Sequence, residues 1–332
     1  MFKPVKIVMA GLAHPHGISF LKDLLKFENV DVVGFYDEEA PDAAVSAAEQ
    51  FGATAFDSLD GLFEQNADLF LTAAVNDRKP DLCIRALKAG LTVAADKPFA
   101  VDLDGIDKLE KALEGLPPSR FFPLFTERYV PEVIAARSLI ESGEVGTPVN
   151  MYFVRPHRLN PARRPGWMFE RSRYGGIIND IGVHDIDLAR YFSGSEVERV
   201  LSAHTANSRY TEYPDFCDNG AAMLRMASGA SASLSVNWLT PEQYPCHGNT
   251  RFFINATKGE IDISTTADLQ ARVRFCSDSR PPQYLPLIET DLSPASDLIA
   301  CLRDPKHIPL VTAVDAINST RAALLAQKAA EK

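Results

Sequence analysis

The fold of the amino-terminal half is decided by residues 5–17, which read VKIVMAGLAHPHG. An apolar β-rich run at 5–9 reaches Gly11, and a helical pattern follows at 18–27. A strand that ends in glycine and opens into a helix presents backbone N–H groups, and the positive end of the helix, to a pyrophosphate. The stretch therefore predicts a dinucleotide-binding turn at the start of a parallel sheet.

The glycine fingerprint of this turn is incomplete. The pattern G-x-G-x-x-G requires glycine at positions 11, 13 and 16, whereas the chain has Gly11, Ala13 and His16, with Gly17 one position late. We expect the side chain of His16 to stand where the helix normally packs closely on the strand. The candidate cofactor contacts in this turn are Gly11, Ala13, His14 and His16.

A second apolar run, at 30–36, ends in Asp37, which lies 26 residues after Gly11. An acidic residue roughly 20 residues after the glycine turn binds the ribose 2′-hydroxyl of NAD, and its charge repels the 2′-phosphate of NADP. Asp37 therefore favours NAD over NADP. A solvated aspartate at a strand end or helix cap is the alternative interpretation.

Periodicity divides the chain into two parts. Up to Phe125, short apolar runs alternate with helix-length segments, a pattern typical of an α/β fold with a doubly wound parallel sheet, the Rossmann arrangement. After Phe125, closely spaced β-rich runs and a few helices predict an α+β domain with a large, mostly antiparallel open sheet. We expect domains at 1–125 and 126–332.

Charge and hydropathy exclude several classes of protein. The 332 residues include 34 basic and 44 acidic side chains, a net charge of −10 that disfavours nucleic acid as a partner. No apolar run approaches the ~20 residues needed to span a bilayer, and the first residues contain no signal-peptide pattern. We therefore expect a cytoplasmic protein with no membrane partner. The five cysteines are widely spaced and predict neither a disulfide framework nor a zinc site.

Three further segments resemble a known family. Residues 95–99 read ADKPF, and residues 175–187 read GGIINDIGVHDID. They are similar to the E-K-P and G-G-x-x-x-D-x-G-x-H-x-x-D signatures of the Gfo/Idh/MocA oxidoreductases, with Asp96 in place of glutamate. Val75-Asn76 resembles the family's proline-asparagine loop near the nicotinamide, with Lys79 where the family has histidine.

The resemblance implies an NAD-dependent oxidoreductase that acts on a sugar, an inositol or a related polyol. It implies a catalytic set of Lys97, Asp180 and His184, and a cis peptide bond at Lys97-Pro98. It also implies a homodimer or homotetramer formed through the open face of the second sheet. The further cofactor contacts that it implies are Val75, Asn76, Asp96, Lys97 and Pro98.

The residues themselves support this chemistry. Intervals of four and three place Asp180, His184 and Asp187 along one side of a helix. A carboxylate beside an imidazole fixes its tautomer, and histidine titrates near neutral pH, as a general base requires. We expect the amine of Lys97 and the imidazole of His184 to meet beside the nicotinamide. The alternatives are a surface lysine and a core histidine.

A local excess of arginine bears on the substrate. Residues 155–173 contain six arginines and one glutamate in a chain that is acidic as a whole. Because arginine binds carboxylate or phosphate and tryptophan stacks on sugars, an anionic sugar or inositol is one interpretation. An oligomer interface or a set of intrachain ion pairs is the other. The candidate substrate contacts are Arg128, Arg158, Arg164 and Trp167.

Two other functions compete with a dehydrogenase. A non-catalytic member of the same fold would bind NAD or a sugar without turnover. A metal-dependent hydrolase would use His14 and His16 as an H-x-H pair after the first strand, completed by His184 and Asp187. That hydrolase requires a barrel of eight strand-helix units, so we expect no metal site.

Overall fold

The computed structural model describes residues 4–266, 272–287 and 290–332. The chain divides into two compact units, of which the first combines Met1–Phe125 with Asp291–Ile317. The second combines Thr126–Thr290 with Asn318–Lys332. The predicted division into consecutive domains at 1–125 and 126–332 does not include this late return of the chain to the first unit. The division into domains therefore stays a prediction.

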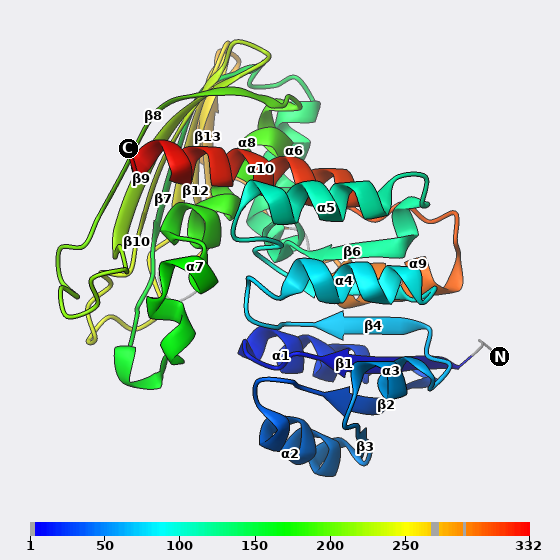
Figure 1. Cartoon of the computed structure of the whole chain (residues 1–332). Coiled ribbons are helices and arrows are strands. Elements are labelled where there is room, and N and C mark those ends of the chain that lie inside the picture. The colour runs from blue at the N-terminus through cyan, green and yellow to red at the C-terminus, as the bar shows by residue number, and fades with distance from the viewer. Residues whose placement is uncertain (1–3, 267–271, 288–289) are drawn as a thin grey trace. The chain divides into compact units, whose positions relative to one another are not determined.

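Six parallel strands form the sheet of the first unit, in the order β3-β2-β1-β4-β5-β6 (Figure 1). Their central members are buried apolar runs because helices cover both faces of such a sheet. The order is that of the doubly wound dinucleotide-binding fold, so the predicted fold class is confirmed for this half. The strands are β1 (Val5–Ala10), β2 (Val30–Tyr36), β3 (Thr54–Ala55), β4 (Leu69–Thr72), β5 (Thr92–Asp96) and β6 (Phe121–Leu124).

Helices connect these strands, and the late return adds one more. Helix α4 packs against α5, and α1 packs against α9. The Arg303 side chain donates to the Glu28 carbonyl at 2.9 Å, which fastens the returning segment to the first unit. The helices are α1 (Pro15–Leu24), α2 (Pro41–Phe51), α3 (Leu59–Phe63), α4 (Lys79–Lys88), α5 (Leu103–Leu113) and α9 (Pro294–Arg303), with a 3₁₀ turn at Pro118–Arg120.

Helix α1 begins earlier than the sequence pattern predicts. The apolar periodicity places its start at 18, whereas the structure starts it at Pro15. The fixed φ of proline suits the first helical position, where the missing N–H is no loss. The His14 ring then caps the helix by accepting the His16 N–H at 3.4 Å. Both histidines of the turn therefore lie at the amino-terminal end of α1.

The second unit contains an eight-stranded sheet in the order β14-β13-β12-β11-β7-β10-β9-β8 (Figure 1). Only the β7–β10 pair is parallel among its described strands, so the prediction of a mostly antiparallel sheet is confirmed. The strands are β7 (Pro148–Pro156), β8 (Val197–Ala206), β9 (Asn219–Met226), β10 (Ser231–Asn237), β11 (Arg251–Ala256), β12 (Gly259–Ser264), β13 (Arg272–Ser277) and β14 (Arg280–Tyr284).

One face of this sheet is covered by helices, whereas the other carries exposed apolar side chains. Helices α6 and α8 contact the sheet, and Phe153 and Phe252 are buried opposite each other. On the opposite face, Tyr152 and Val154 are 45% and 47% exposed. The helical elements are α6 (Pro131–Glu141), α7 (Arg171–Tyr174), α8 (Val183–Ser193), the part of α10 (Ala313–Ala330) that begins at Asn318, a π-helix at Ile178–Gly182, and 3₁₀ turns at Thr126–Tyr129, Pro161–Arg163 and Gly166–Phe169.

This topology excludes the barrel that a metal-dependent hydrolase requires. The described strands form one open parallel sheet of six and one mixed sheet of eight, not eight parallel strand-helix units. The hydrolase alternative, with His184 and Asp187 completing a site at His14 and His16, is therefore wrong as a fold. Among the described residues, no helix has both the length and the apolar character to cross a bilayer.

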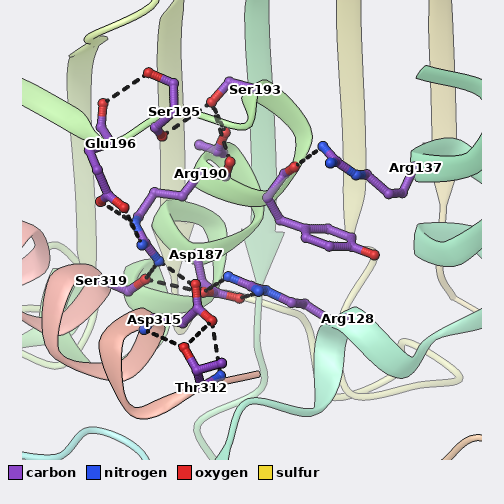
Figure 2. A network of polar contacts seen from close by, with 12 residues as sticks. Arg128, Arg137, Asp187, Arg190, Ser193, Ser195, Glu196, Thr312, Asp315 and Ser319 are labelled. Carbon is purple, nitrogen blue, oxygen red and sulfur yellow. Dashed lines mark hydrogen bonds and ion pairs between the residues drawn. The ribbon is translucent and has the colours of Figure 1, made fainter. Parts of the chain in front are cut away.

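A buried ion pair fixes helix α8 within the second unit (Figure 2). Arg128 donates through Nε and Nη2 to both carboxylate oxygens of Asp187, at 2.8 and 2.7 Å. The two residues are 5% and 1% exposed. The Ser319 hydroxyl donates to the same carboxylate at 3.1 Å, and Arg190 binds Glu196 at 2.6 Å. Asp187 therefore supports the helix.

Removal of this arginine should destabilise the protein strongly. Arg128→Ala leaves the Asp187 charge buried without its bidentate partner, so we expect a loss of about 3–5 kcal/mol in the free energy of unfolding by urea. Arg225→Ala is the matched control, because its pair with Glu198 is about half exposed on both sides and should contribute at most ~1 kcal/mol. Equal losses in the two variants would contradict this account.

Candidate functional site

The turn after β1 approaches the end of β4 so closely that only glycine fits. Gly11 has φ +75, and a Cβ placed on it would lie 2.3 Å from Cβ of Ala74. The Gly11 N–H donates to the Tyr36 carbonyl at 3.0 Å, and its carbonyl accepts the Ala73 N–H at 3.1 Å. The turn is therefore held against both neighbouring strands.

The third glycine of the fingerprint is present, one residue later than the pattern places it. A Cβ on Gly17 would lie 2.6 Å from both Ala73 Cβ and Met9 Cε, so Gly17 makes the close helix-to-strand approach. The expectation that His16 occupies this position is wrong. Its side chain is 57% exposed and lies instead beside Asp96.

The carboxylate of Asp37 joins the end of β2 to the glycine turn. One oxygen accepts the Leu12 N–H at 2.7 Å, and the other accepts the N–H groups of Glu39 and Ala40, each at 3.0 Å. Asp37 is 7% exposed, so its orientation is fixed before any ligand arrives. A carboxylate held in this way has further lone pairs that remain able to accept a hydroxyl.

A pocket of about 370 Å³ lies at this edge of the sheet. Its volume is in the range of small-ligand sites. Acidic residues from the end of β2 and basic residues from α4 both contribute to its wall, and Arg78 pairs with Glu39 at 3.4 Å. The residues that bear on the predicted site are Gly11, Ala13, Asp37, Val75 and Arg78.

A buried lysine connects the two loops that the sequence assigns to the nicotinamide end. Lys79 is 1% exposed, and its Nζ donates to Asn76 Oδ1 at 2.9 Å. It also donates to the carbonyls of Lys97 and Pro98, at 3.1 and 3.3 Å. The Lys97-Pro98 peptide bond is cis, as the resemblance implies. Lys79 thus takes a positioning role that the family pattern does not assign to it.

Two histidines of the glycine turn lie against Asp96 at the end of β5. Nδ1 of His14 is 3.3 Å from Oδ2 of Asp96, and Nδ1 of His16 is 3.2 Å from Oδ1. Burial lowers the pKa of His14 to about 3, so its ring is neutral. Burial alone raises the pKa of Asp96, but its hydrogen bond to His16 and the charge of Lys79 hold that pKa below the ordinary value.

In the second unit, the motif residue Asp180 lies in a π-helical turn. The π-helix Ile178–Gly182 continues directly into α8, and it follows a glycine pair whose members both have positive φ. Such π-helical turns occur frequently at functional sites. Asp180 is 8% exposed and lies one turn before the partly exposed His184.

Asp180 accepts a hydrogen bond from a tyrosine that the sequence does not reveal as a site residue. Tyr174 donates to Asp180 Oδ2 at 2.8 Å, and Trp238 Nε1 donates to the Tyr174 hydroxyl at 3.0 Å. Burial and the Asp180 charge raise the pKa of Tyr174 well above its usual value, so the hydroxyl stays a donor. Tyr174 lies six residues before Asp180, and Trp238 directly follows strand β10, so no spacing rule connects the three.

Most arginine side chains of the arginine-rich stretch form ion pairs or hydrogen bonds with other residues of the same chain. Arg155 is buried between Asp185 at 2.8 Å and Glu127 at 3.1 Å. Arg158 donates to the carbonyls of Tyr244 and Cys246, and Arg171 pairs with Glu331. Arg164 donates to the Leu159 carbonyl and lies over the Trp238 ring at 4.7 Å. Intrachain pairing, the second interpretation of this stretch, therefore describes most of it.

Two of the four candidate substrate residues, Arg128 and Trp167, differ in whether their side-chain donors already have hydrogen-bond partners. Arg128 binds both carboxylate oxygens of Asp187, and its predicted contact with the substrate stays a prediction. Trp167 is 8% exposed, and its Nε1 has no hydrogen-bond acceptor among the described residues. A buried indole N–H of this kind is normally satisfied, so it marks a position where a ligand oxygen would be accommodated.

Comparison with known proteins identifies both halves of the chain. A family model described as an oxidoreductase family with an NAD-binding Rossmann fold matches residues 5–116. A second model, described as the GFO/IDH/MocA C-terminal domain, matches residues 133–262. Together the two matches cover more than half of the chain.

Individual relatives are similar at low identity. The chain is 25% identical to inositol 2-dehydrogenase 2 of Saccharopolyspora erythraea, over 70% of this chain and 66% of that relative. It is 27% identical to inositol 2-dehydrogenase of Rhizobium meliloti, over 74% and 72% of the two chains. A solved oxidoreductase structure from Erwinia carotovora atroseptica is 26% identical, with a TM-score of 0.87 over 98% of both chains.

Substitution at the glycine turn should separate dinucleotide binding from folding. Gly11→Ala forces a methyl group against Ala74, so the turn must shift and we expect NADH binding to weaken at least about tenfold. Gly52→Ala is the matched control, because Gly52 also has positive φ but nothing within 4 Å of its Cβ position. NADH fluorescence titration measures both, with circular dichroism as the check of folding. Unchanged affinity in Gly11→Ala would refute the assignment.

Proposed function

The chain belongs to the Gfo/Idh/MocA family of NAD-binding oxidoreductases, and from this premise we propose that it is an NAD(H)-dependent dehydrogenase of polyols. It would transfer hydride between nicotinamide and a hydroxyl-bearing carbon of a sugar, an inositol or a related polyol. One observation carries the proposal. The pocket between Gly11 and Asp37 stands at the carboxyl edge of a parallel sheet, where open α/β sheets bind their ligands.

The residues at this edge fit a dinucleotide. Gly11 leaves room for backbone approach to a pyrophosphate, Ala13 and Val75 line the pocket, and the oriented Asp37 carboxylate suits a ribose hydroxyl. His14, His16, Asn76, Asp96 and Pro98 complete the proposed surroundings. We propose NAD rather than NADP because the fixed charge of Asp37 opposes a 2′-phosphate. When bound, the cofactor supplies the hydride acceptor or donor.

We assign the acid-base work to His184, Asp180 and Lys97. His184 would exchange the proton of the reacting hydroxyl, because an imidazole titrates near neutral pH. Asp180, held by the Tyr174 hydroxyl, would favour the protonated form of that imidazole. Lys97 would donate a hydrogen bond to the substrate oxygen and stabilise developing alkoxide charge. Their positions within the family's motifs support these three roles.

The proposed substrate class rests on the named relatives and on the chemistry of the second unit. Both named relatives are inositol dehydrogenases. Trp167 offers a buried N–H and an apolar ring surface, and Arg158 and Arg164 lie in the same arginine-rich stretch as further contacts. A polyhydroxylated ring matches such a set of donors. Turnover is what distinguishes this proposal from a non-catalytic binding protein.

We also propose that the chain forms a homodimer or homotetramer through the open face of its second sheet. On that face Tyr152, Val154 and Met223 are 40–47% exposed. Large exposed apolar side chains gathered on one face are typical of protein interfaces.

Loss of the proposed base should lower turnover while cofactor affinity stays unchanged. We expect His184→Ala to reduce kcat by about 10² to 10⁴ with a polyol that the wild type oxidises. The same preparation should bind NADH as the wild type does. His204→Ala, a histidine substitution in strand β8, is the control and should keep its activity. A panel of inositols and sugars, followed by NADH absorbance, identifies the substrate. Full turnover in His184→Ala would remove that residue from the role.

Cofactor preference should depend on the charge of Asp37. We expect the wild type to bind NADH at least about tenfold more tightly than NADPH, because the carboxylate repels the 2′-phosphate. Asp37→Asn removes the charge but keeps an oxygen that accepts the Glu39 and Ala40 N–H groups. Paired fluorescence titrations should show the NADH preference narrowing in this variant. An unaltered ratio of affinities would show that Asp37 does not select the cofactor.

A further inference from the structure

We propose that His14, His16 and Asp96 bind a divalent metal ion of the zinc class at the carboxyl edge of the first sheet. One potential ligand atom from each residue lies within 4.8 Å of the other two. Two nitrogen donors and one carboxylate form a common ligand set for zinc. Neither the Gfo/Idh/MocA resemblance nor the proposed hydride transfer includes such an ion.

The two nitrogen-to-oxygen distances match those between ligands that share one ion, and the full set of three ligand atoms lies within 4.8 Å. Nδ1 of His14 and Nδ1 of His16 lie 3.3 and 3.2 Å from the two oxygens of Asp96. Tetrahedral ligands at zinc bond lengths of 2.0–2.2 Å are separated from each other by about 3.3–3.6 Å. The rings of His14 and His16 lie 4.0 Å apart, centre to centre. A modest rotation of the exposed His16 ring would suffice to complete the set.

The hydrogen bonding around His14 favours a cation between the imidazole and the carboxylate. Nδ1 of His14 accepts the backbone N–H of His16 in a long hydrogen bond of 3.4 Å, so this nitrogen carries no proton, and a metal ion would take over its single lone pair. It nevertheless faces Oδ2 of Asp96, which is buried and has no hydrogen-bond partner among the described residues. Two acceptors at 3.3 Å repel each other unless a proton or metal ion bridges them.

Nearby charges determine the affinity of the site for a cation. The positive charges of Lys79 and Lys97 both act to lower the pKa of His14, and the charge of Lys79 also acts to lower the pKa of Asp96. They oppose a cation, whereas the Asp96 carboxylate attracts it. The Nζ of Lys79 donates hydrogen bonds to Asn76 Oδ1 and to two backbone carbonyls. The balance predicts a moderate-affinity site, not a permanently loaded structural one.

The site is open on one side. The side chains of His14 and His16 are 18% and 57% exposed, whereas that of Asp96 is 2% exposed. An ion would therefore enter from the histidine side and keep at least one position for water or for a ligand oxygen, since the described residues supply three ligands. It would also link the turn after β1 to the end of β5, and so stabilise the first unit.

The test is direct titration of tag-free, EDTA-treated protein with Zn²⁺ by calorimetry. Co²⁺ in place of Zn²⁺ reports tetrahedral coordination through its visible absorption. We expect one ion per chain and a Zn²⁺-dependent rise in Tm. His16→Ala and Asp96→Asn should each weaken binding by about tenfold to a hundredfold or more, since even residues that only support a ligand contribute that much. His16 is exposed and Asn is isosteric with Asp, so both variants should fold.

Two further variants serve as matched controls. His204→Ala removes a histidine from the other unit, and His307→Ala removes one from a pair with Asp297 that offers only a single imidazole. Both should keep wild-type stoichiometry and affinity. NADH fluorescence on the same samples tests the cofactor proposal separately. Absence of stoichiometric Zn²⁺ binding, or equal affinity in all four variants, would overturn the metal site even if NADH binds normally.

Discussion

The contact between the turn after β1 and the end of β4 is the constraint on which the first unit depends. Because Gly11 has no Cβ, the turn lies against Ala74, and its backbone bonds reach both β2 and β4. The same turn is held by the Asp37 carboxylate through the Leu12 N–H. Pocket, helix start and both histidines of the turn take their positions from this one close approach. A larger side chain would displace all of them together.

The departures from the glycine fingerprint turn out to be connected. Moving the third glycine from position 16 to 17 keeps the close helix-to-strand approach and frees position 16 for a side chain. That side chain is His16, and it meets Asp96, the residue that replaces the family's glutamate. In the sequence, the shifted glycine, His16 and Asp96 show no connection with one another. In three dimensions they form one cluster, which is the physical reason for proposing a shared ligand there.

Sequence periodicity predicted the elements that bury long apolar runs, and it failed for those stabilised by other means. Strands β1, β2, β4 and β5 were predictable because helices cover both of their faces. The two-residue β3 and β14, whose five residues are all exposed, carry no such pattern. The family resemblance singled out Asp180 and His184 but not Tyr174 and Trp238, because the contacts of Tyr174 with Asp180 and of Trp238 with Tyr174 come from tertiary packing. Likewise, the count of charged residues along the sequence located the arginines but did not reveal their ion-pair and hydrogen-bond partners.

The intrachain partners of these arginines change the inference about the charge of the substrate. Arg155 and Arg171 are neutralised by acids, and the guanidinium of Arg158 is engaged by backbone carbonyls. A cation whose hydrogen bonds are already made contributes little to binding an anion, because moving it would leave buried carbonyls or carboxylates unsatisfied. Three buried donors of this stretch have no hydrogen-bond partner among the described residues, namely Arg155 Nη2, Arg158 Nε and the neutral Trp167 Nε1. The intrachain contacts of these arginines therefore weaken the argument from charge for an anionic sugar, which is one of the two interpretations that the sequence leaves open.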